Sequence, residues 1–79
     1  MQNVIIYSTP ACHYCRMAKE IFDKNNIKYI EKDIAGDAEA RDEALKKSGQ
    51  LITPIIDIDG KILAGFDETK IKQALGINK

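Results

Sequence analysis

The 79-residue chain has no tryptophan, one histidine, two cysteines and two prolines. Its 12 basic and 12 acidic residues give a formal net charge of zero. It therefore lacks the basic excess that a nucleic-acid-binding surface needs. It also lacks an apolar segment of about 20 residues, the length that a membrane-spanning helix requires. We therefore expect neither nucleic acid nor a membrane as a partner.

The two cysteines, Cys12 and Cys15, are too close in sequence to stabilise the chain as a disulfide. A bond between them closes a very short loop and removes little conformational entropy from the unfolded chain. Met1-Gln2 leads directly into an apolar segment, with no charged or long apolar leader before it. We therefore expect one soluble, cytoplasmic, monomeric domain over residues 1–79. In that compartment a lone Cys-x-x-Cys pair is more often catalytic or metal-binding than structural.

Hydrophobic periodicity predicts seven alternating elements in the order strand, helix, strand, helix, strand, strand, helix. The continuous apolar run Val4–Tyr7 is typical of a strand that is buried on both faces. Asp59-Gly60 between two apolar runs predicts a tight hairpin. The predicted strands cover about 3–8, 27–33, 54–58 and 61–64, and the predicted helices cover about 16–25, 38–47 and 68–75.

Capping residues and apolar spacing define the helices. Asp37 and Asp67 are predicted N-caps, and Gly49 and Gly76 are predicted C-terminal ends. The residues predicted to face the core are Met17, Ala18, Ile21 and Phe22 in the first helix, Ala40, Ala44 and Leu45 in the second, and Ile71, Ala74 and Leu75 in the third.

The spacing of Cys12 and Cys15 suits reversible disulfide formation. Residues three apart on a helix have Cβ atoms about 5–6 Å apart, and a disulfide needs about 3.5–4.5 Å. Cys12 is expected at or just before the first helical residue, where unpaired N–H groups and the helix dipole favour a thiolate. Cys15 lies inside the first turn and should keep its proton longer. These positions predict Cys12 as the nucleophile and Cys15 as the resolving thiol.

Three neighbours of the cysteines have two readings each. A protonated His13 would favour the Cys12 thiolate, or His13 is an exposed side chain with little effect. Arg16 has the same modulating role or is a solvated residue of the first turn. Tyr14 contacts a substrate or is a partly buried surface aromatic.

Thr53-Pro54 is the second notable feature. A proline that opens a strand cannot donate a ladder hydrogen bond, so it lies at a strand start or an edge. The peptide bond before it is either cis, as proline allows, or trans. Composition alone favours trans.

These features together resemble the glutaredoxins over essentially the whole chain. The segment 6–15, Ile-Tyr-Ser-Thr-Pro-Ala-Cys-His-Tyr-Cys, resembles their first strand and dithiol motif. Ile52-Thr53-Pro54 resembles the element whose cis-proline faces the active-site sulfurs, and residues 65–68, Gly-Phe-Asp-Glu, resemble the loop that enters their last helix.

The resemblance implies an α/β, thioredoxin-like fold, with helices on both faces of a four-stranded mixed sheet ordered 2-1-3-4. It implies thiol–disulfide oxidoreductase activity on protein or small-molecule disulfides, with roles in electron transport and cell redox homeostasis. It also implies a cis Pro54, a Thr53 backbone that pairs with substrate, and substrate contacts at Gly65 and Asp67. Asp67 is equally explained as a helix cap. No bound cofactor is expected, and glutathione is a possible reductant.

The chain departs from the family pattern near the expected glutathione site. Glutaredoxins commonly have a lysine near the position of Thr9 and a glycine at the position of Ala64, and a proline where His13 stands. The pair Gly65-Phe66 and the short length are also similar to redoxins that receive electrons from thioredoxin reductase and supply ribonucleotide reductase. The sequence therefore leaves two donors open, glutathione and thioredoxin reductase.

Two rival readings come from other classes. Cys12, His13 and Cys15 offer at most three metal ligands, whereas a closed zinc site needs four. A metal or iron–sulfur site would therefore need a dimer or an added thiol, and we expect no metal. A redox-silent interaction module would be unaffected when Cys12 becomes Ser.

Overall fold

A computed structural model of the chain describes residues 3–50 and 52–76. Met1 and Gln2, which the sequence places directly before the first strand, lie outside the described residues. The elements follow the predicted order: β1 (Val4–Ser8), α1 (His13–Lys24), β2 (Ile30–Asp33), α2 (Ala38–Ser48), β3 (Ile55–Ile58), β4 (Lys61–Ala64) and α3 (Glu68–Leu75).

The four strands form one mixed sheet in the order β2-β1-β3-β4. β1 is parallel to β2 and antiparallel to β3, and β3 is antiparallel to β4. This confirms the predicted strand order and the thioredoxin-like arrangement. The parallel pair is joined through α1, because a parallel connection requires a long crossover.

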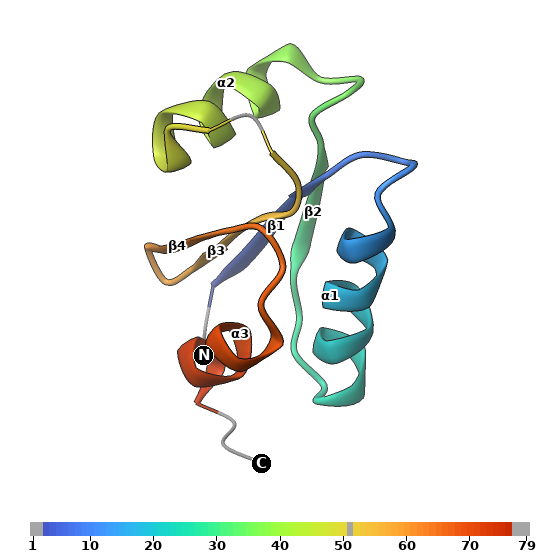
Figure 1. The fold of residues 1–79 in the computed structure, drawn as a ribbon, viewed down its shortest axis with the longest axis vertical. Coiled ribbons are helices and arrows are strands. Elements are labelled where there is room, and N and C mark those ends of the chain that lie inside the picture. The colour runs from blue at the N-terminus through green and yellow to red at the C-terminus, as the bar shows by residue number, and fades with distance from the viewer. Residues whose placement is uncertain (1–2, 51, 77–79) are drawn as a thin grey trace.

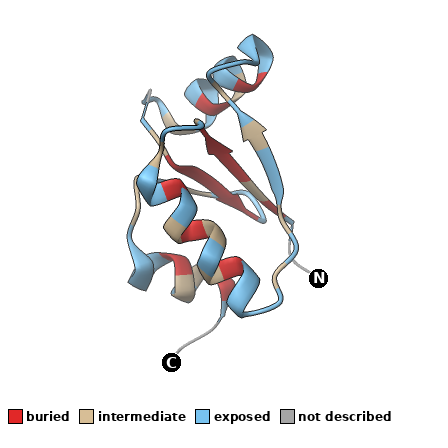
Figure 2. Cartoon of the chain, turned by 90° about the vertical axis from the view of Figure 1, so that its right-hand side faces the viewer, coloured by how far each residue is buried: buried red, intermediate tan, exposed pale blue. Residues whose placement is uncertain are grey.

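The sheet separates two apolar layers (Figure 1). On one face, α1 and α3 pack on the sheet through residues Val4, Ile6, Cys15, Ala18, Phe22, Ile56, Ile58, Ile71 and Leu75. On the other face, α2 packs through Ala44 against Tyr7 and Ile55. In Figure 2 the buried residues lie on the central strands and on the helix sides that face them. The period-2 alternation of side chains explains how β1 contributes to both layers.

Polar side chains bind α2 to its face of the sheet. Lys47 Nζ contacts Asp57 Oδ2 at 2.7 Å and Tyr7 Oη at 2.8 Å. The Tyr7 hydroxyl is also hydrogen-bonded to Glu43, which pairs with Lys32 at 3.0 Å. Although burial alone lowers the pKa of Lys47, its hydrogen bonds to Asp57 and Tyr7 raise that pKa overall. These contacts satisfy the polar groups that β1 and β3 place under α2.

The hairpin between β3 and β4 follows the sequence prediction. Asp59 and Gly60 both have positive φ, 52° and 90°. Two-residue turns of this kind match the twist of the strands, and Gly tolerates the left-handed conformation.

Three details correct the sequence predictions. α1 begins at His13, three residues before the start that the apolar pattern indicated, because Cys12 caps it, as was predicted for that residue. β2 begins at Ile30 rather than Ile27, since the Ile27 N–H is bonded to Phe22 at the end of α1. Leu45, which was predicted to face the core, is 40% exposed, because the buried residues of α2 are Ala40 and Ala44. No helix in the described ranges is long and apolar enough to cross a membrane.

Candidate active site

Cys12 is the N-cap of α1. Its backbone is extended, with φ −81° and ψ 109°, and its N–H is bonded to the Thr9 carbonyl at 3.2 Å. The Cys15 N–H donates to the Cys12 Sγ at 3.1 Å. The sulfur therefore occupies the position where a helix N-terminus presents unpaired donors. This confirms the predicted place of Cys12 at the helix start.

Cys12 and Cys15 are joined as a disulfide, with their Cα atoms 5.2 Å apart. Cys12 is partly exposed, whereas Cys15 is 1% exposed and belongs to the core beneath α1. One sulfur is thus reachable from solvent, and the other is shielded by the protein. The lower exposure of Cys15 was predicted, and the roles of nucleophile and resolving thiol stay predictions.

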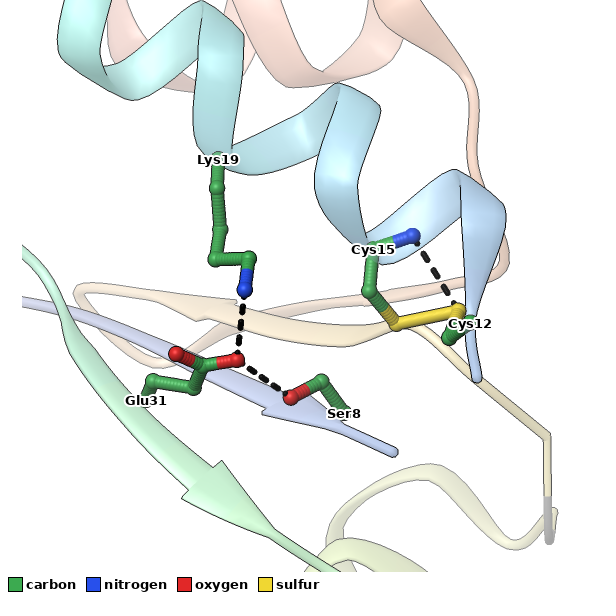
Figure 3. Close-up of a disulfide and its surroundings, with 5 residues drawn as sticks. All are labelled: Ser8, Cys12, Cys15, Lys19 and Glu31. Carbon is green, nitrogen blue, oxygen red and sulfur yellow. Dashed lines mark hydrogen bonds and ion pairs between the residues drawn. A yellow bond between two sulfur atoms is a disulfide. The ribbon is translucent and has the colours of Figure 1, made fainter. Parts of the chain in front are cut away.

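Three hydrogen-bonded polar side chains, those of Ser8, Glu31 and Lys19, lie near the disulfide (Figure 3). The hydroxyl of Ser8, itself 2% exposed, donates to Glu31 Oε2 at 2.8 Å. Lys19 Nζ of α1 reaches the same oxygen at 2.8 Å. The hydrogen bonds from Lys19 and Ser8 hold the pKa of Glu31 below its usual value. These three side chains link β1, β2 and α1 near the cysteines.

Tyr14 lies between the cysteines in sequence and is 55% exposed. Its ring stacks on Phe66 with centroids 5.7 Å apart and planes at 18°. The His13 ring meets Tyr14 edge-on at 5.8 Å, and both His13 and Arg16 are exposed. This stacked pair, in which Tyr14 is exposed and Phe66 is half-buried, joins the dithiol turn to the loop before α3.

The Thr53-Pro54 peptide bond is cis, as the family resemblance implied. Pro54 is buried and Thr53 is half-buried. The Pro54 carbonyl accepts the Gly65 N–H at 2.8 Å, which ties this turn to the loop before α3. Gly65 has φ +88°, a conformation that favours glycine.

The acidic residues of that loop have structural partners. Asp67 caps α3 by accepting the Lys70 N–H at 3.2 Å. Glu68 pairs with Lys72 at 2.8 Å, one turn along the helix. The capping reading of Asp67 is therefore confirmed. Its predicted contact with substrate stays a prediction.

The sequence analysis also considered a metal or iron–sulfur site at the cysteines. Over residues 3–50 and 52–76, no three His, Cys, Asp or Glu side chains are grouped closely enough to bind a metal ion. Sequence reasoning missed two contacts at the site: Ser8 with Glu31, and Tyr14 with Phe66. Each joins segments far apart in the chain, and no local pattern identifies such pairs.

The site can be compared with known proteins. The glutaredoxin family profile matches residues 4–63. The chain is 37% identical over 70 residues to a glutaredoxin-like 8.6 kDa protein of the Clostridium pasteurianum rubredoxin operon, covering 89% of this chain and 93% of the relative. It is 36% identical over 76 residues to Escherichia coli K12 glutaredoxin 3, covering 96% and 92%.

Solved structures agree with these matches. The thioredoxin-like protein BC3987 has a TM-score of 0.87 at 36% identity, covering 91% of this chain and 99% of that protein. A glutaredoxin from Archaeoglobus fulgidus has a TM-score of 0.83 at 20% identity, covering 95% and 87%, and supports the fold alone. With its fold, its paired cysteines and these matches, the chain belongs to the glutaredoxin family of thiol–disulfide oxidoreductases.

Proposed function

We propose that the protein reduces disulfides of other proteins through a dithiol cycle, with Cys12 as the nucleophile and Cys15 as the resolving thiol. The observation that carries this proposal is the different environment of the two sulfurs. Cys12 is partly exposed and caps α1, while Cys15 is buried one turn inside the helix. An N–H donor and the helix dipole stabilise a thiolate at Cys12.

The cycle consists of two exchange steps. The Cys12 thiolate attacks one sulfur of the substrate disulfide, forms a mixed disulfide and releases the other substrate sulfur as a thiolate. Cys15 then loses its proton and attacks the Cys12 sulfur, which releases the second substrate thiolate. The substrate has gained two electrons, and the protein holds the Cys12–Cys15 disulfide seen in the structure.

The surface around Cys12 supports binding of an extended substrate segment. The half-buried Thr53 precedes the cis-proline, and its backbone would pair with the substrate as a short added strand. Gly65 holds the neighbouring loop against Pro54. Tyr14 offers an exposed aromatic face beside the cysteines. His13 and Arg16, both exposed cations when protonated, would modulate the thiolate.

Two electron donors are candidates. Membership of the glutaredoxin family supports glutathione. Thioredoxin reductase is supported by the local sequence, since Thr9 provides no cation for a glutathione carboxylate and Ala64 replaces a family glycine. Either donor returns two electrons and two protons to the oxidised pair. We also propose that the protein works as a cytoplasmic monomer without a bound cofactor, which cell fractionation, size-exclusion chromatography and metal analysis would test.

The test is a coupled NADPH assay on a protein disulfide with two donors in parallel, glutathione plus its reductase and thioredoxin reductase. We expect NADPH oxidation with at least one donor. Cys12→Ser should abolish it, and Cys15→Ser should accumulate a mixed disulfide visible by mass spectrometry. Unchanged activity of Cys12→Ser, or no turnover with either donor, would refute the proposed function.

A further inference from the structure

A shallow groove runs along α1 beside the start of α3. It has a volume of about 180 Å³ and is lined by Met17, Glu20, Ile21, Lys24, Phe66 and Glu68. We call it the α1–α3 groove. The catalytic cycle described above uses none of these side chains.

Three of the six residues that line the groove are apolar, Met17, Ile21 and Phe66, and the other three are charged, Glu20, Lys24 and Glu68. Met17, Ile21 and Phe66 are all half-buried, so each presents part of its surface to solvent. Glu68 is paired with Lys72 at 2.8 Å, and the formal charges of Glu20 and Lys24 also cancel, so the groove carries no formal net charge. Such a lining favours an uncharged, apolar group over a charged one.

The groove is continuous with the surface at the cysteines. Phe66 lines the groove and stacks on Tyr14 at 5.7 Å, and Tyr14 is two residues from Cys12. A polypeptide whose disulfide lies at Cys12 can therefore extend over Tyr14 towards Met17 and Ile21.

The volume limits what the groove can hold. Small-molecule sites have volumes of about 300–1,000 Å³, and this groove has about 180 Å³. A whole tripeptide or nucleotide is too large for it, whereas one leucine-sized side chain fits. The groove is open, so the rest of the occupant would remain at the surface.

We propose that the α1–α3 groove is a specificity subsite for protein substrates, which accepts one aliphatic side chain close to the disulfide cysteine. This inference rests on the proposed function and names its substrate class. An extended, apolar segment of a protein substrate would occupy both the site at Cys12 and the groove. Glutathione, a tripeptide, would not fit the groove.

Geometry gives the expected spacing in the substrate. Along α1, Cys12 lies about seven residues before the midpoint of Met17 and Ile21. At a rise of 1.5 Å per residue, this separation is about 10 Å. An extended chain advances about 3.3 Å per residue. The aliphatic side chain therefore belongs about three residues from the substrate cysteine.

The test uses single turnovers of the pre-reduced protein, which need no electron donor. The substrates are cysteine peptides linked to thionitrobenzoate, with Leu or Ser three residues from the cysteine on either side. Thionitrobenzoate is the better leaving group, so Cys12 bonds to the peptide sulfur. A neutral small disulfide, 2,2′-dithiodipyridine, reports the reactivity of Cys12 without the groove.

We expect a Leu peptide to react about tenfold faster than its Ser counterpart, because one apolar contact in a partial pocket is worth about that factor. Met17→Gln keeps the charge and helix propensity of α1, and it should reduce the preference to less than threefold. Its rate with 2,2′-dithiodipyridine should stay within twofold of the native rate. Ala38→Gln is the matched control, because Ala38 is exposed on α2 at the other face of the sheet.

The outcomes separate the two proposals. If the native protein does not consume 2,2′-dithiodipyridine, the dithiol function itself fails. If it does, but Leu and Ser peptides react equally, only the groove proposal is overturned, and this comparison needs no variant. A preserved Leu preference in Met17→Gln, with circular dichroism showing a folded protein, also overturns it.

Discussion

The backbone N–H of Cys15 points at the sulfur of Cys12 across 3.1 Å. In the reduced protein the same donor would stabilise a Cys12 thiolate, since both groups belong to the first turn of α1. A hydrogen bond to a charged group is worth about 1.5–3 kcal/mol, and each pKa unit corresponds to about 1.4 kcal/mol. This backbone donor therefore contributes to the asymmetry between the thiols, together with the burial of Cys15.

We predict that Cys12 of the reduced protein is alkylated at lower pH than a free thiol, because its place at the start of α1 favours the thiolate. Iodoacetamide rates against pH, followed by mass spectrometry of peptides, measure this pH dependence. Cys15→Ser keeps the N–H donor and should keep the Cys12 profile. Cys12→Ser should leave a thiol that reacts at least tenfold more slowly at neutral pH, because Cys15 is buried. Equal profiles for both cysteines would contradict the prediction.

Glu31 should contribute pH-dependent stability. Its pKa is lowered in the folded protein by hydrogen bonds from Lys19 and Ser8. The stabilisation is therefore complete above the unfolded-state pKa, near 4.5, and disappears as the pH falls through the lower folded-state pKa. Since the Glu31 side chain is 40% exposed, we expect Glu31→Gln to cost only about 0.5–1 kcal/mol at pH 7.

Urea denaturation at pH 7 and at acid pH measures this difference. The gap between native protein and Glu31→Gln should close in acid. Asp42→Asn, at an exposed position of α2, is the control and should change stability by less than about 0.5 kcal/mol at either pH. If the difference in stability between the native protein and Glu31→Gln persisted unchanged in acid, the charge of Glu31 would not be its cause.

The pair of Lys47 and Asp57 should stabilise the fold without affecting the redox site. The Asp57 side chain is 12% exposed and accepts both Lys47 Nζ at 2.7 Å and the Gly60 N–H at 2.8 Å. Asp57→Ala leaves both donors without this acceptor, and we expect a loss of about 2–4 kcal/mol.

Chemical denaturation measures the loss, and a thiol-exchange rate on the folded variant tests its independence from the site. We expect that rate to stay within twofold, because the pair lies on the α2 face and the cysteines lie on the other. Lys46→Met, a change at the exposed neighbour of Lys47, should cost less than about 0.5 kcal/mol. A large rate change in Asp57→Ala would place the pair in the redox machinery instead.

Gly65→Ala should lower both stability and activity. A Cβ there would be 3.9 Å from Ile52 Cδ1, an ordinary contact, so the cost arises from the positive φ of 88°. A left-handed conformation costs a non-glycine residue about 1–2 kcal/mol. Gly49→Ala, at φ +73° at the end of α2 with open space around it, should cost about the same stability.

The two variants differ in their expected activity. The Gly65 N–H holds the loop before α3 to Pro54 at 2.8 Å, and Phe66 of this loop stacks on Tyr14 of the dithiol turn. Gly65→Ala should therefore slow reduction of a peptide disulfide several-fold. Gly49→Ala should not. Equal rates in the two variants would show that the loop conformation does not influence substrate binding.

Local sequence signals predicted most of the fold. Asp37 and Asp67 cap α2 and α3, Gly49 and Gly76 end them in left-handed conformations, and Asp59-Gly60 makes the hairpin. These features succeed because capping and turn chemistry depend on a few adjacent residues. The start of β2 was less predictable, since its pairing with β1 decides which residues join the strand.

The sequence by itself determined the dithiol turn, because its spacing, the preceding strand and the following helix are all local. The sequence also determined the apolar patterns from which the order of strands and helices was predicted. Only the tertiary structure decided which distant groups meet: Glu31 with Ser8, Phe66 with Tyr14, and Lys47 with Asp57. The two residues of each pair lie in different segments of the chain. The packing of the helices on the sheet sets the distance between them, and no stretch of neighbouring residues encodes that distance.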